Sequence, residues 1–523
     1  MNEAVKSVVI VGGGTAGWLT AGIIAAEHQA NSNLGIDLTL IESPDIHPIG
    51  VGEGTWPTMR NTLQTIGISE IDFLHCCDAS FKQGSQFIGW VNGQNNDQYY
   101  HPFVAPQGFG QSNISGYWQQ HCNQIPFAHA VSVQPHLCDH GCAPKQKQTP
   151  EFAAVANYGY HLNAAKFAAL LQRHCIENLG VKHIADHVEK VNGALESDIE
   201  SVTTRNHGEI SASLFIDCSG SNAILLSKHY QIPFINKKDI LFNDSAIAAQ
   251  VPYETDDADI ASHTLSTAQQ AGWIWDIGLP TRRGVGYTYA SDYLSDEVAE
   301  QTLKDYLAKD ISAETISKLV FRKIVFTPGH REKFWHKNCV AIGMAAGFLE
   351  PLEASALALV ELSAKMIAKE LPASKSIMPI TEQRFNQRFH YRWQRIIEFL
   401  KLHYVLSKRT DSEYWLDNRQ EKTIPARLQQ LLALWQYQEP TYNDFTEIEE
   451  IFPAASYQYI LYGMGFITHT RETNRRYDNI NISKKNLEEN QKLSQKYLAG
   501  LPSNRALIDY LIQSKVNTSA KTY

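Results

Sequence analysis

The sequence predicts an α/β fold, in which a Rossmann-like, doubly wound parallel sheet carries an inserted antiparallel sheet and a mainly helical C-terminal module. Three observations predict it. A short apolar strand near the N-terminus runs into a glycine-rich turn and a helix, as a dinucleotide-binding unit begins. Residues 240–325 carry strand patterns with few helices, and apolar residues beyond position 380 follow helical spacing. We therefore expect a first module at 1–380, with the inserted sheet at about 240–325, and a helical module at 381–523 packed closely on it.

The glycine-rich turn follows the strand Val8-Val9-Ile10-Val11. Gly12, Gly14 and Gly17 match G-x-G-x-x-G, whose glycines permit the tight turn, the close approach of a pyrophosphate and close helix–strand packing. The N–H groups of the next helix, expected over 19–26, then point at the phosphates. A second strand, 37–41, ends in Glu42, where an acidic side chain takes the ribose hydroxyls. The predicted dinucleotide contacts here are Gly12, Gly14, Thr15, Ala16, Gly17 and Glu42.

Composition excludes several classes of protein. The formal net charge is −9, whereas a general nucleic-acid binder has a basic footprint. No apolar run reaches the roughly 20 residues that span a bilayer, and the N-terminus enters the first strand without room for a signal peptide. Eight cysteines in 523 residues are too few for a disulfide scaffold. We expect a cytoplasmic protein with no membrane or nucleic-acid partner.

Two stretches before residue 104 carry candidate site residues. Residues 49–57 hold three glycines, which favours a strap over the cofactor with contacts from Val51 and Gly52, although a plain loop fits equally. Lys82 lies among aromatic residues beside Gly84, but a lone lysine is usually a solvated surface group. The cluster at 99–103 could form a stacking pocket or a corner of the core.

Residues 104–150 are polar and predict a long irregular loop. Within it, four metal-ligand types alternate at a spacing of two and would share one face of an extended segment: His136, Cys138, His140 and Cys142. Structural zinc sites space their ligand pairs two to four residues apart across a turn. We therefore predict no metal site.

The middle of the chain predicts further elements of the sheet. Apolar spacing predicts a helix over 164–177, and residues 181–191 and 199–204 predict a small hairpin. Residues 213–220 form another buried strand and a tight turn, a contact line for the cofactor. Trp273 and Trp275 face the same side of a strand, as a wall of a site or as sheet packing.

A buried strand at 338–342 runs into small residues that let backbone approach a flat ligand. A helix is expected to begin near Ala354, where its N–H groups can hold an anion. Glu353 next to that start would either cap the helix or face a cavity. Cofactor contacts are expected here from Gly343, Met344 and Leu349.

Four of these stretches together resemble the flavin-dependent tryptophan halogenases, over residues 7 to about 465. They are Gly12-x-Gly14-x-x-Gly17-Trp18, Phe81-Lys82-x-Gly84, Trp273-x-Trp275-x-Ile277 and Gly347-Phe348-x-Glu350-Pro351-Leu352-Glu353. The resemblance implies an FAD-binding fold of the flavin monooxygenase type with a C-terminal module that covers the substrate. It also implies a partner, a separate NAD(P)H-dependent flavin reductase that supplies reduced FAD, and a chloride or bromide ion as co-substrate. A homodimer is compatible with it.

The resemblance also implies the roles of single residues. The oxidised halide, as hypohalous acid, reaches the lysine that matches Lys82, and the glutamate that matches Glu353 polarises it or removes the ring proton. The amides of Ser355 and Ala356 are candidates for the halide site because of their place at a helix start. The substrate pocket is expected to consist of His101, Phe103, Trp273 and Trp275, the two tryptophans separating flavin from substrate.

Two stretches depart from the family pattern. Ala354-Ser355 follows the glutamate where Ser-Thr is common, which leaves the backbone amides in place. Between Trp435 and Gly463, no residues match the set that grips the amino-acid end of tryptophan. We therefore expect an open site that prefers free indole or a substituted indole. A single-component flavin hydroxylase and a non-catalytic FAD-binding protein are the alternatives, although hydroxylases usually carry Gly-Asp at Gly343-Met344.

Overall fold

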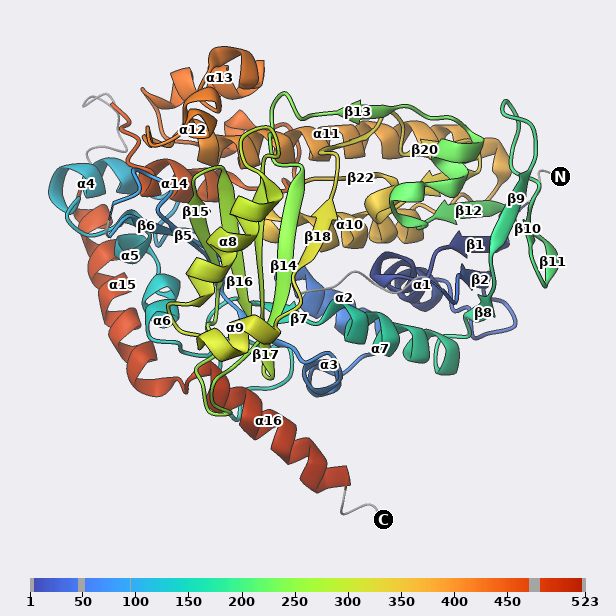
Figure 1. Ribbon diagram of the computed structural model, residues 1–523, viewed down its shortest axis with the longest axis horizontal. Helices are drawn as coiled ribbons and strands as arrows, with labels where there is room; N and C mark the ends of the chain where they lie inside the picture. The colour runs from blue at the N-terminus through green and yellow to red at the C-terminus, as the bar shows by residue number, and fades with distance from the viewer. Residues whose placement is uncertain (1–3, 46–51, 95, 470–479, 520–523) are drawn as a thin grey trace. The chain divides into compact units, whose positions relative to one another are not determined.

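A computed structural model describes residues 4–45, 52–94, 96–469 and 480–519 (Figure 1). The chain divides into two compact units. Unit 1 comprises residues 1–79, 162–237 and 327–393, and unit 2 comprises residues 80–161, 238–326 and 394–523. This division differs from the consecutive modules expected at 1–380 and 381–523. The inserted sheet groups with the stretch that begins at residue 80, because strands from both stretches are hydrogen-bonded in one sheet.

Unit 1 is built on a six-stranded sheet with the order β20-β21-β12-β1-β2-β8. β1 (Ser7–Val11) lies inside it and pairs in parallel with β2 (Asp37–Glu42) and β12 (Leu214–Asp217). The remaining strands are β8 (Lys182–Ala185), β20 (Trp335–His336) and β21 (Cys339–Ala341). The predicted Rossmann-like core is confirmed. Its carboxyl-end edge, where β1 and β12 end, is where such sheets bind ligands.

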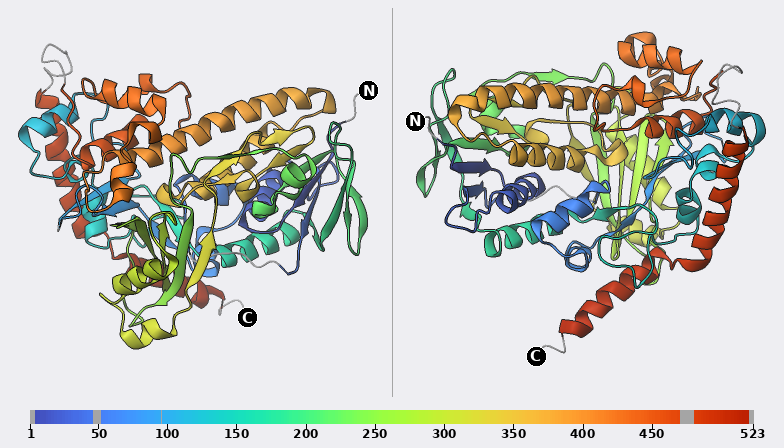
Figure 2. Two further views of the ribbon diagram at one scale, coloured as in Figure 1. Left: turned by 45° about the horizontal axis from the view of Figure 1, so that its top comes forward. Right: turned by 180° about the vertical axis from the view of Figure 1, so that it is seen from behind.

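Helices pack beside this sheet. They are α1 (Thr15–Glu27), α2 (Thr58–Ile66), α3 (Glu70–Cys76), α7 (Ala164–Glu177) and α10 (Ser355–Lys369). α1 packs against both α7 and α10, as the turned views of Figure 2 also show. α7 has the predicted bounds, because its buried positions Phe167, Leu170 and Leu171 fall on one helical face.

The hairpin predicted from residue 181 onward is only half right. Residues 182–185 form β8, which pairs in parallel with β2 and so extends the main sheet. The antiparallel partners are instead β9 (Val188–Asn192), β10 (Ser201–Thr204) and β11 (Gly208–Ser211). A further small sheet joins β13 (Phe234–Asn236), β19 (Gly329–Arg331) and β22 (Gly347–Phe348).

Unit 2 contains a seven-stranded sheet with the order β18-β14-β17-β16-β15-β5-β6. Its strands are β5 (Gly84–Ile88), β6 (Gln98–Pro102), β14 (Ser245–Pro252), β15 (Thr264–Gln269), β16 (Gly272–Gly278), β17 (Arg282–Tyr289) and β18 (Arg322–Val325). The pairing is antiparallel except between β15 and β5. A short antiparallel ribbon pairs β4 (Ser80–Lys82) with residues 159–161 of β7 (Gly159–Leu162). The predicted inserted antiparallel sheet is therefore present.

The helices of unit 2 surround this sheet. α8 (Asp296–Leu307) packs on β14 and β17, and α9 (Ala313–Lys318) follows it (Figure 1). The later helices are α12 (Glu413–Asp417), α13 (Ala426–Trp435), α14 (Ala454–Gly463), α15 (Ile480–Gly500) and α16 (Asn504–Ser519). α11 (Met378–Val405) contributes residues to both units. The predicted helical C-terminal region is confirmed.

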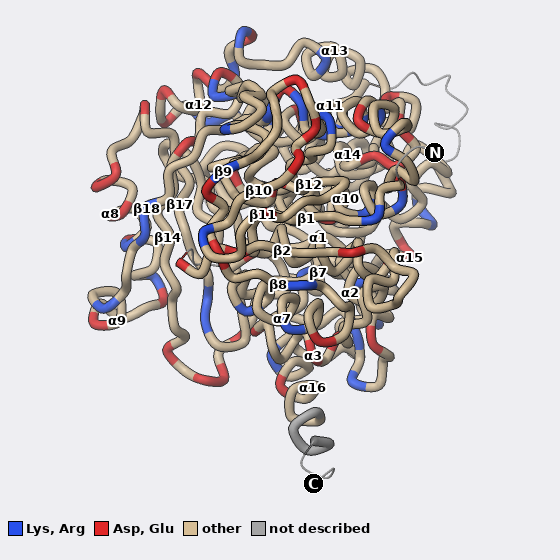
Figure 3. The backbone as a smooth tube through the Cα atoms, turned by 90° about the vertical axis from the view of Figure 1, so that its right-hand side faces the viewer, with Lys and Arg blue, Asp and Glu red and all other residues tan. Residues whose placement is uncertain are grey.

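The predicted irregular loop at 104–150 is wrong. It contains α4 (Ile114–His121), α5 (Phe127–Val131) and α6 (Gln134–Asp139). All three pack against α15, so tertiary contacts stabilise helices that are too short to form alone. Among the helices described, none is long and apolar enough to cross a membrane. Basic and acidic positions are interspersed along the backbone (Figure 3).

Candidate active site

The glycine turn after β1 is shaped by close backbone contacts. Gly12 has φ +112°, and a Cβ there would lie 2.2 Å from the carbonyl oxygen of Cys218. A Cβ on Gly17 would lie 1.8 Å from the carbonyl oxygen of Gly12. Gly14 differs, because nothing lies within 4 Å of its Cβ position and no side chain caps α1. Gly12 and Gly17 therefore shape the turn, and Gly14 leaves open space at a helix N-terminus, which suits a phosphate.

Glu42 at the end of β2 lies against this turn. Trp18 Nε1 donates to its Oε2 at 3.3 Å, and Gln172 Nε2 donates to the same oxygen at 3.2 Å. His183 Nε2 lies 3.3 Å from it as well. The other oxygen, Oε1, is 2.5 Å from where a Cβ on Gly13 would be, so a side chain at Gly13 would require Glu42 to move. Burial raises the pKa of Glu42.

This arrangement fits the predicted ribose contact, because Oε2 is held by protein groups and Oε1 faces the turn. Sequence reasoning named Glu42 but missed the residues that orient it. Of these, only Trp18 lies near the motif in sequence, whereas Gln172 and His183 come from α7 and β8. Nothing in the local sequence links those two to the second strand.

The other predicted cofactor contacts of unit 1 lie after β21. Gly343 has φ +68°, and a Cβ there would lie 2.9 Å from the Cβ of Ala16, so this turn touches the start of α1. Met344 is exposed and Leu349 is buried. Arg331, which the sequence did not single out, donates from Nε to the carbonyl of Ala345 at 3.3 Å. Predicted contact Val51 lies outside the described residues.

Asp217 anchors the turn after β12. Its carboxylate accepts backbone N–H bonds from Ser219 at 3.0 Å, Leu225 at 2.8 Å and Leu226 at 2.9 Å. The turn therefore holds its shape beside Gly12 at the carboxyl edge of the sheet. The sequence predicted a contact line here but not the role of this aspartate.

Glu353 and Ala354 both adopt the left-handed conformation just before α10, with φ of 63° and 54°. Such a conformation costs a non-glycine residue about 1 kcal/mol or more, so the surrounding structure must impose it. Trp56 contributes, because its Nε1 donates to the carbonyl oxygen of Glu353 at 2.8 Å. Glu353 is 7% exposed.

α10 begins at Ser355, as predicted, without a side-chain cap at Ala354. Its first amides, which include those of Ser355 and Ala356, therefore form a helix N-terminus that suits an anion.

Lys82 is the central polar residue of unit 2. It ends β4 and is 1% exposed, which is rare for a lysine. Its Nζ lies 5.5 Å from the centroid of the Phe103 ring. Gly84 lets β6 come this close, because a Cβ there would lie 2.5 Å from the carbonyl oxygen of His101.

His101 and Phe103 border an aromatic cluster. The ring of His101 lies 5.6 Å from Phe399 and 6.4 Å from Phe452, and these two phenylalanines stack at 3.8 Å. Tyr459 of α14 lies 6.2 Å from His101. The structure thus places Lys82 beside Phe103 and His101 beside an aromatic cluster, and their role as a substrate pocket stays a prediction.

Trp273 and Trp275 lie on one face of β16, with ring centroids 6.3 Å apart. Trp273 packs 6.2 Å from Trp90. Trp275 closes over Gly286, where a Cβ would lie 2.2 Å from the indole ring. Both are therefore part of the aromatic core, and their role as a wall between cofactor and substrate stays a prediction.

The four alternating metal-ligand types do not share a face. His136 and Cys138 are helical residues of α6, so the extended segment assumed for them is wrong. His136 Nε2 is instead 2.9 Å from the carbonyl of His129, and His140 Nδ1 is 2.9 Å from that of His136. Across the described ranges no group of three or more His, Cys, Asp or Glu could hold a metal ion.

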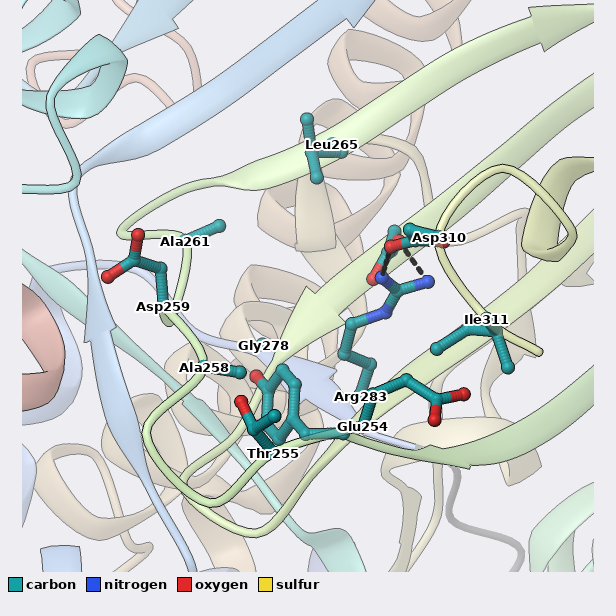
Figure 4. A pocket seen from close by; sticks show the side chains of 12 residues that line it. Glu254, Thr255, Ala258, Asp259, Ala261, Leu265, Gly278, Arg283, Asp310 and Ile311 are labelled. Atoms are coloured by element: carbon teal, nitrogen blue, oxygen red, sulfur yellow. Dashed lines mark hydrogen bonds and ion pairs between the residues drawn. The ribbon is translucent and has the colours of Figure 1, made fainter. Parts of the chain in front are cut away.

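A separate cavity of about 250 Å³ lies in unit 2 (Figure 4). Figure 4 shows Arg283 reaching toward Asp310, with which it forms an ion pair. Asp276 lies 3.3 Å from the same guanidinium, and burial raises its pKa to about 6. Because Asp276 alternates with Trp273 and Trp275 on β16, this cavity is on the opposite face of the strand.

Comparisons with known proteins agree with this geometry. The family model for tryptophan halogenase matches residues 7–478. The chain is 33% identical to the 7-chloro-L-tryptophan 6-halogenase KtzR of Kutzneria sp. (strain 744), covering 88% of this chain and 90% of that protein. It is 32% identical to the tryptophan 7-halogenase RebH of Lentzea aerocolonigenes, covering 80% of each. The crystal structure of a tryptophan halogenase from Shewanella frigidimarina NCIMB 400 is 48% identical, with a TM-score of 0.94 over 98% of both chains.

Proposed function

The chain belongs to the tryptophan halogenase family, whose members are flavin-dependent enzymes, and we propose that it is a two-component halogenase acting on an indole-type ring. It would take reduced FAD from a separate NAD(P)H-dependent reductase, and use dioxygen with chloride or bromide. The observation that carries the proposal is Lys82, a buried lysine whose Nζ lies beside the Phe103 ring.

The residues of unit 1 fit FAD. The open space at Gly14 and the N-terminus of α1 would hold the pyrophosphate, and Glu42 Oε1 would accept from a ribose hydroxyl. Bound reduced FAD supplies the electrons with which dioxygen is activated to oxidise the halide. The uncapped start of α10, at Ser355 and Ala356, would hold that halide as an anion.

Lys82 and Glu353 would direct the halogen onto the ring. The lysine N–H groups hold the oxygen of hypohalous acid and favour its departure as water. The ring carbon forms its bond to halogen as the halogen–oxygen bond breaks. The Glu353 carboxylate stabilises the positive charge on the ring and accepts its proton. The leaving hydroxide takes up one proton and the ring gives one proton to Glu353, so hypohalous acid and the ring yield the halogenated ring and water.

Two substitutions test these roles. Lys82→Ala and Glu353→Gln should each abolish halogenation in an assay with reductase, FAD, NADH and halide, while the fluorescence-measured FAD affinity stays unchanged. Lys145→Ala is a matched control, because Lys145 is equally buried at 1% and its Nζ lies 5.5 Å from the Tyr158 ring. It should keep halogenation even if it lowers stability. Full activity of either test variant would overturn the assigned roles.

The substrate we propose is free indole or a substituted indole in preference to tryptophan. The proposal rests on the stretch between Trp435 and Gly463, in which no residues match the set that grips the amino-acid end of tryptophan. Binding of a zwitterion would therefore leave its charges poorly paired. We expect kcat/KM for indole to exceed that for tryptophan about tenfold, measured by mass spectrometry of the halogenated products. Faster turnover of tryptophan would contradict this preference.

A further inference from the structure

His161 lies beside Lys82 in the ribbon formed by β4 and β7. Ser80 is directly opposite His161, and Lys82 is opposite Gly159. Residues opposite one another in an antiparallel pair share a face, as do alternate residues along a strand. His161 and Lys82 are therefore diagonal neighbours on one face.

His161 is completely buried, and its two ring nitrogens differ. Nε2 lies 2.8 Å from Thr264 Oγ1. Nδ1 is also buried, and within the described part of the chain it has no hydrogen-bond partner. Burial lowers the pKa of His161 well below its ordinary value, and the charge of Lys82 lowers it further. The imidazole is therefore neutral, with one N–H donor and one acceptor nitrogen.

Two other basic side chains near this face, His263 and Lys145, do not supply a positive charge next to His161. His263, which also acts on His161, lies 3.1 Å from Gln86 Oε1, and burial lowers its pKa to about 4 although Asp139 raises it. Lys145 packs on Phe81 and Tyr158, whose positions alternate with Lys82 and Gly159 and so face the other side. Of the two charges that act on His161, the one present at neutral pH is therefore that of Lys82.

We propose that His161 is a positioning residue for Lys82, a neutral imidazole whose buried Nδ1 accepts a hydrogen bond from the Lys82 ammonium through a bridging water. The proposal rests on the proposed function, because it gives Lys82 its role at the halogen. An ammonium group held toward His161 has a defined orientation, and this orientation sets how Lys82 faces the reacting species. Thr264 fixes the imidazole by its contact with Nε2. A buried water needs polar partners, and the Lys82 ammonium and His161 Nδ1 would supply two of them.

The test measures the apparent pKa of Lys82 itself. The pH dependence of trace acetic anhydride labelling, read on the Lys82 peptide by mass spectrometry, reports it without FAD or turnover. His161→Phe removes the acceptor that stabilises the ammonium, so the apparent pKa should fall by half a pH unit or more. His161→Gln keeps an acceptor and should stay near the unmodified enzyme. Halogenation should show kcat about tenfold lower in His161→Phe, with KM for indole within twofold.

Two results would overturn the proposal. One is an unchanged pH profile of Lys82 labelling in His161→Phe, and the other is an equal pKa shift in His161→Gln. If His161→Phe does not fold, Thr264→Val replaces it, since loss of Oγ1 frees the imidazole. That variant should lower the Lys82 pKa, and a profile like that of the unmodified enzyme would overturn the proposal. Failure of the proposed function would instead appear as halogenation by Lys82→Ala.

Discussion

The indole nitrogen of Trp56 donates a hydrogen bond to the backbone carbonyl of Glu353, 2.8 Å away and 297 residues later in the chain. This bond falls on a residue held in the left-handed conformation, followed by a second one at Ala354. It ties the stretch after β3 (Glu53–Gly54) to the start of α10. The backbone that carries the Glu353 carboxylate is therefore held by a residue from a distant part of the chain.

Trp56→Phe should lower kcat of halogenation about tenfold and the free energy of unfolding by about 1 kcal/mol, because one hydrogen bond to a strained carbonyl is lost. Steady-state kinetics and thermal unfolding measure the two effects. Trp335→Phe is the matched control, since Trp335 Nε1 donates at 2.8 Å to the carbonyl of Lys337, another left-handed residue. It should lose similar stability and keep its kcat. Equal losses of kcat in both variants would contradict the role of Trp56.

Substitutions at two glycines of the turn should have different effects, one on cofactor binding and the other on stability. Gly14→Ala should weaken FAD binding at least tenfold without changing the unfolding midpoint of the FAD-free protein, because its Cβ position is open. Its φ of −68° is also accessible to alanine. Gly12→Ala should instead destabilise the protein by several kcal/mol, since its Cβ would overlap the carbonyl of Cys218. Fluorescence titration and calorimetry check this contrast, and unimpaired FAD binding by Gly14→Ala would refute the placement of the pyrophosphate.

Asp276 predicts a pH dependence of stability. Burial raises its pKa from 3.8 to about 6, so the folded state binds its proton more tightly than the unfolded state does. Its contribution to stability is therefore present at pH 4 and is lost as the pH rises to 6, by up to about 3 kcal/mol. Asp276→Asn should flatten the unfolding midpoint over this range. Asp37→Asn, which alters the exposed pair with Lys182, should leave the slope unchanged. A slope that survives in Asp276→Asn would assign the effect to another group.

Much of the fold could be predicted from local pattern. The apolar run of β1, the glycine turn and the periodicity of α7 each reflect contacts that their own residues dictate. The helices α4 to α6 could not be predicted, because they are short and depend on packing against α15, more than 340 residues away. The pairing of β8 with β2 could not be predicted either, because a strand pattern does not show which other strand it pairs with.

Some residues of the candidate site could likewise be predicted from the sequence, and others could not. The motifs around Lys82, Glu42 and Glu353 were enough to identify these three as candidate site residues. Trp56 and His161 could not be identified in this way, because their contacts are with residues distant in sequence. A buried histidine or tryptophan is ordinary in composition, and its importance appears only when its hydrogen-bond partners are known.

The sheet of unit 2 also has a consequence during synthesis. β5 and β6 leave the ribosome early, but β15, which pairs with β5, begins about 175 residues later. At the usual elongation rate of about 5–20 residues per second, the edge of β5 stays unpaired for roughly 10–35 s before β15 is synthesised. During that interval a strand with unpaired backbone groups is open to pairing with other chains. Yield in a heterologous host should therefore depend on translation speed and on chaperones that shield nascent strands.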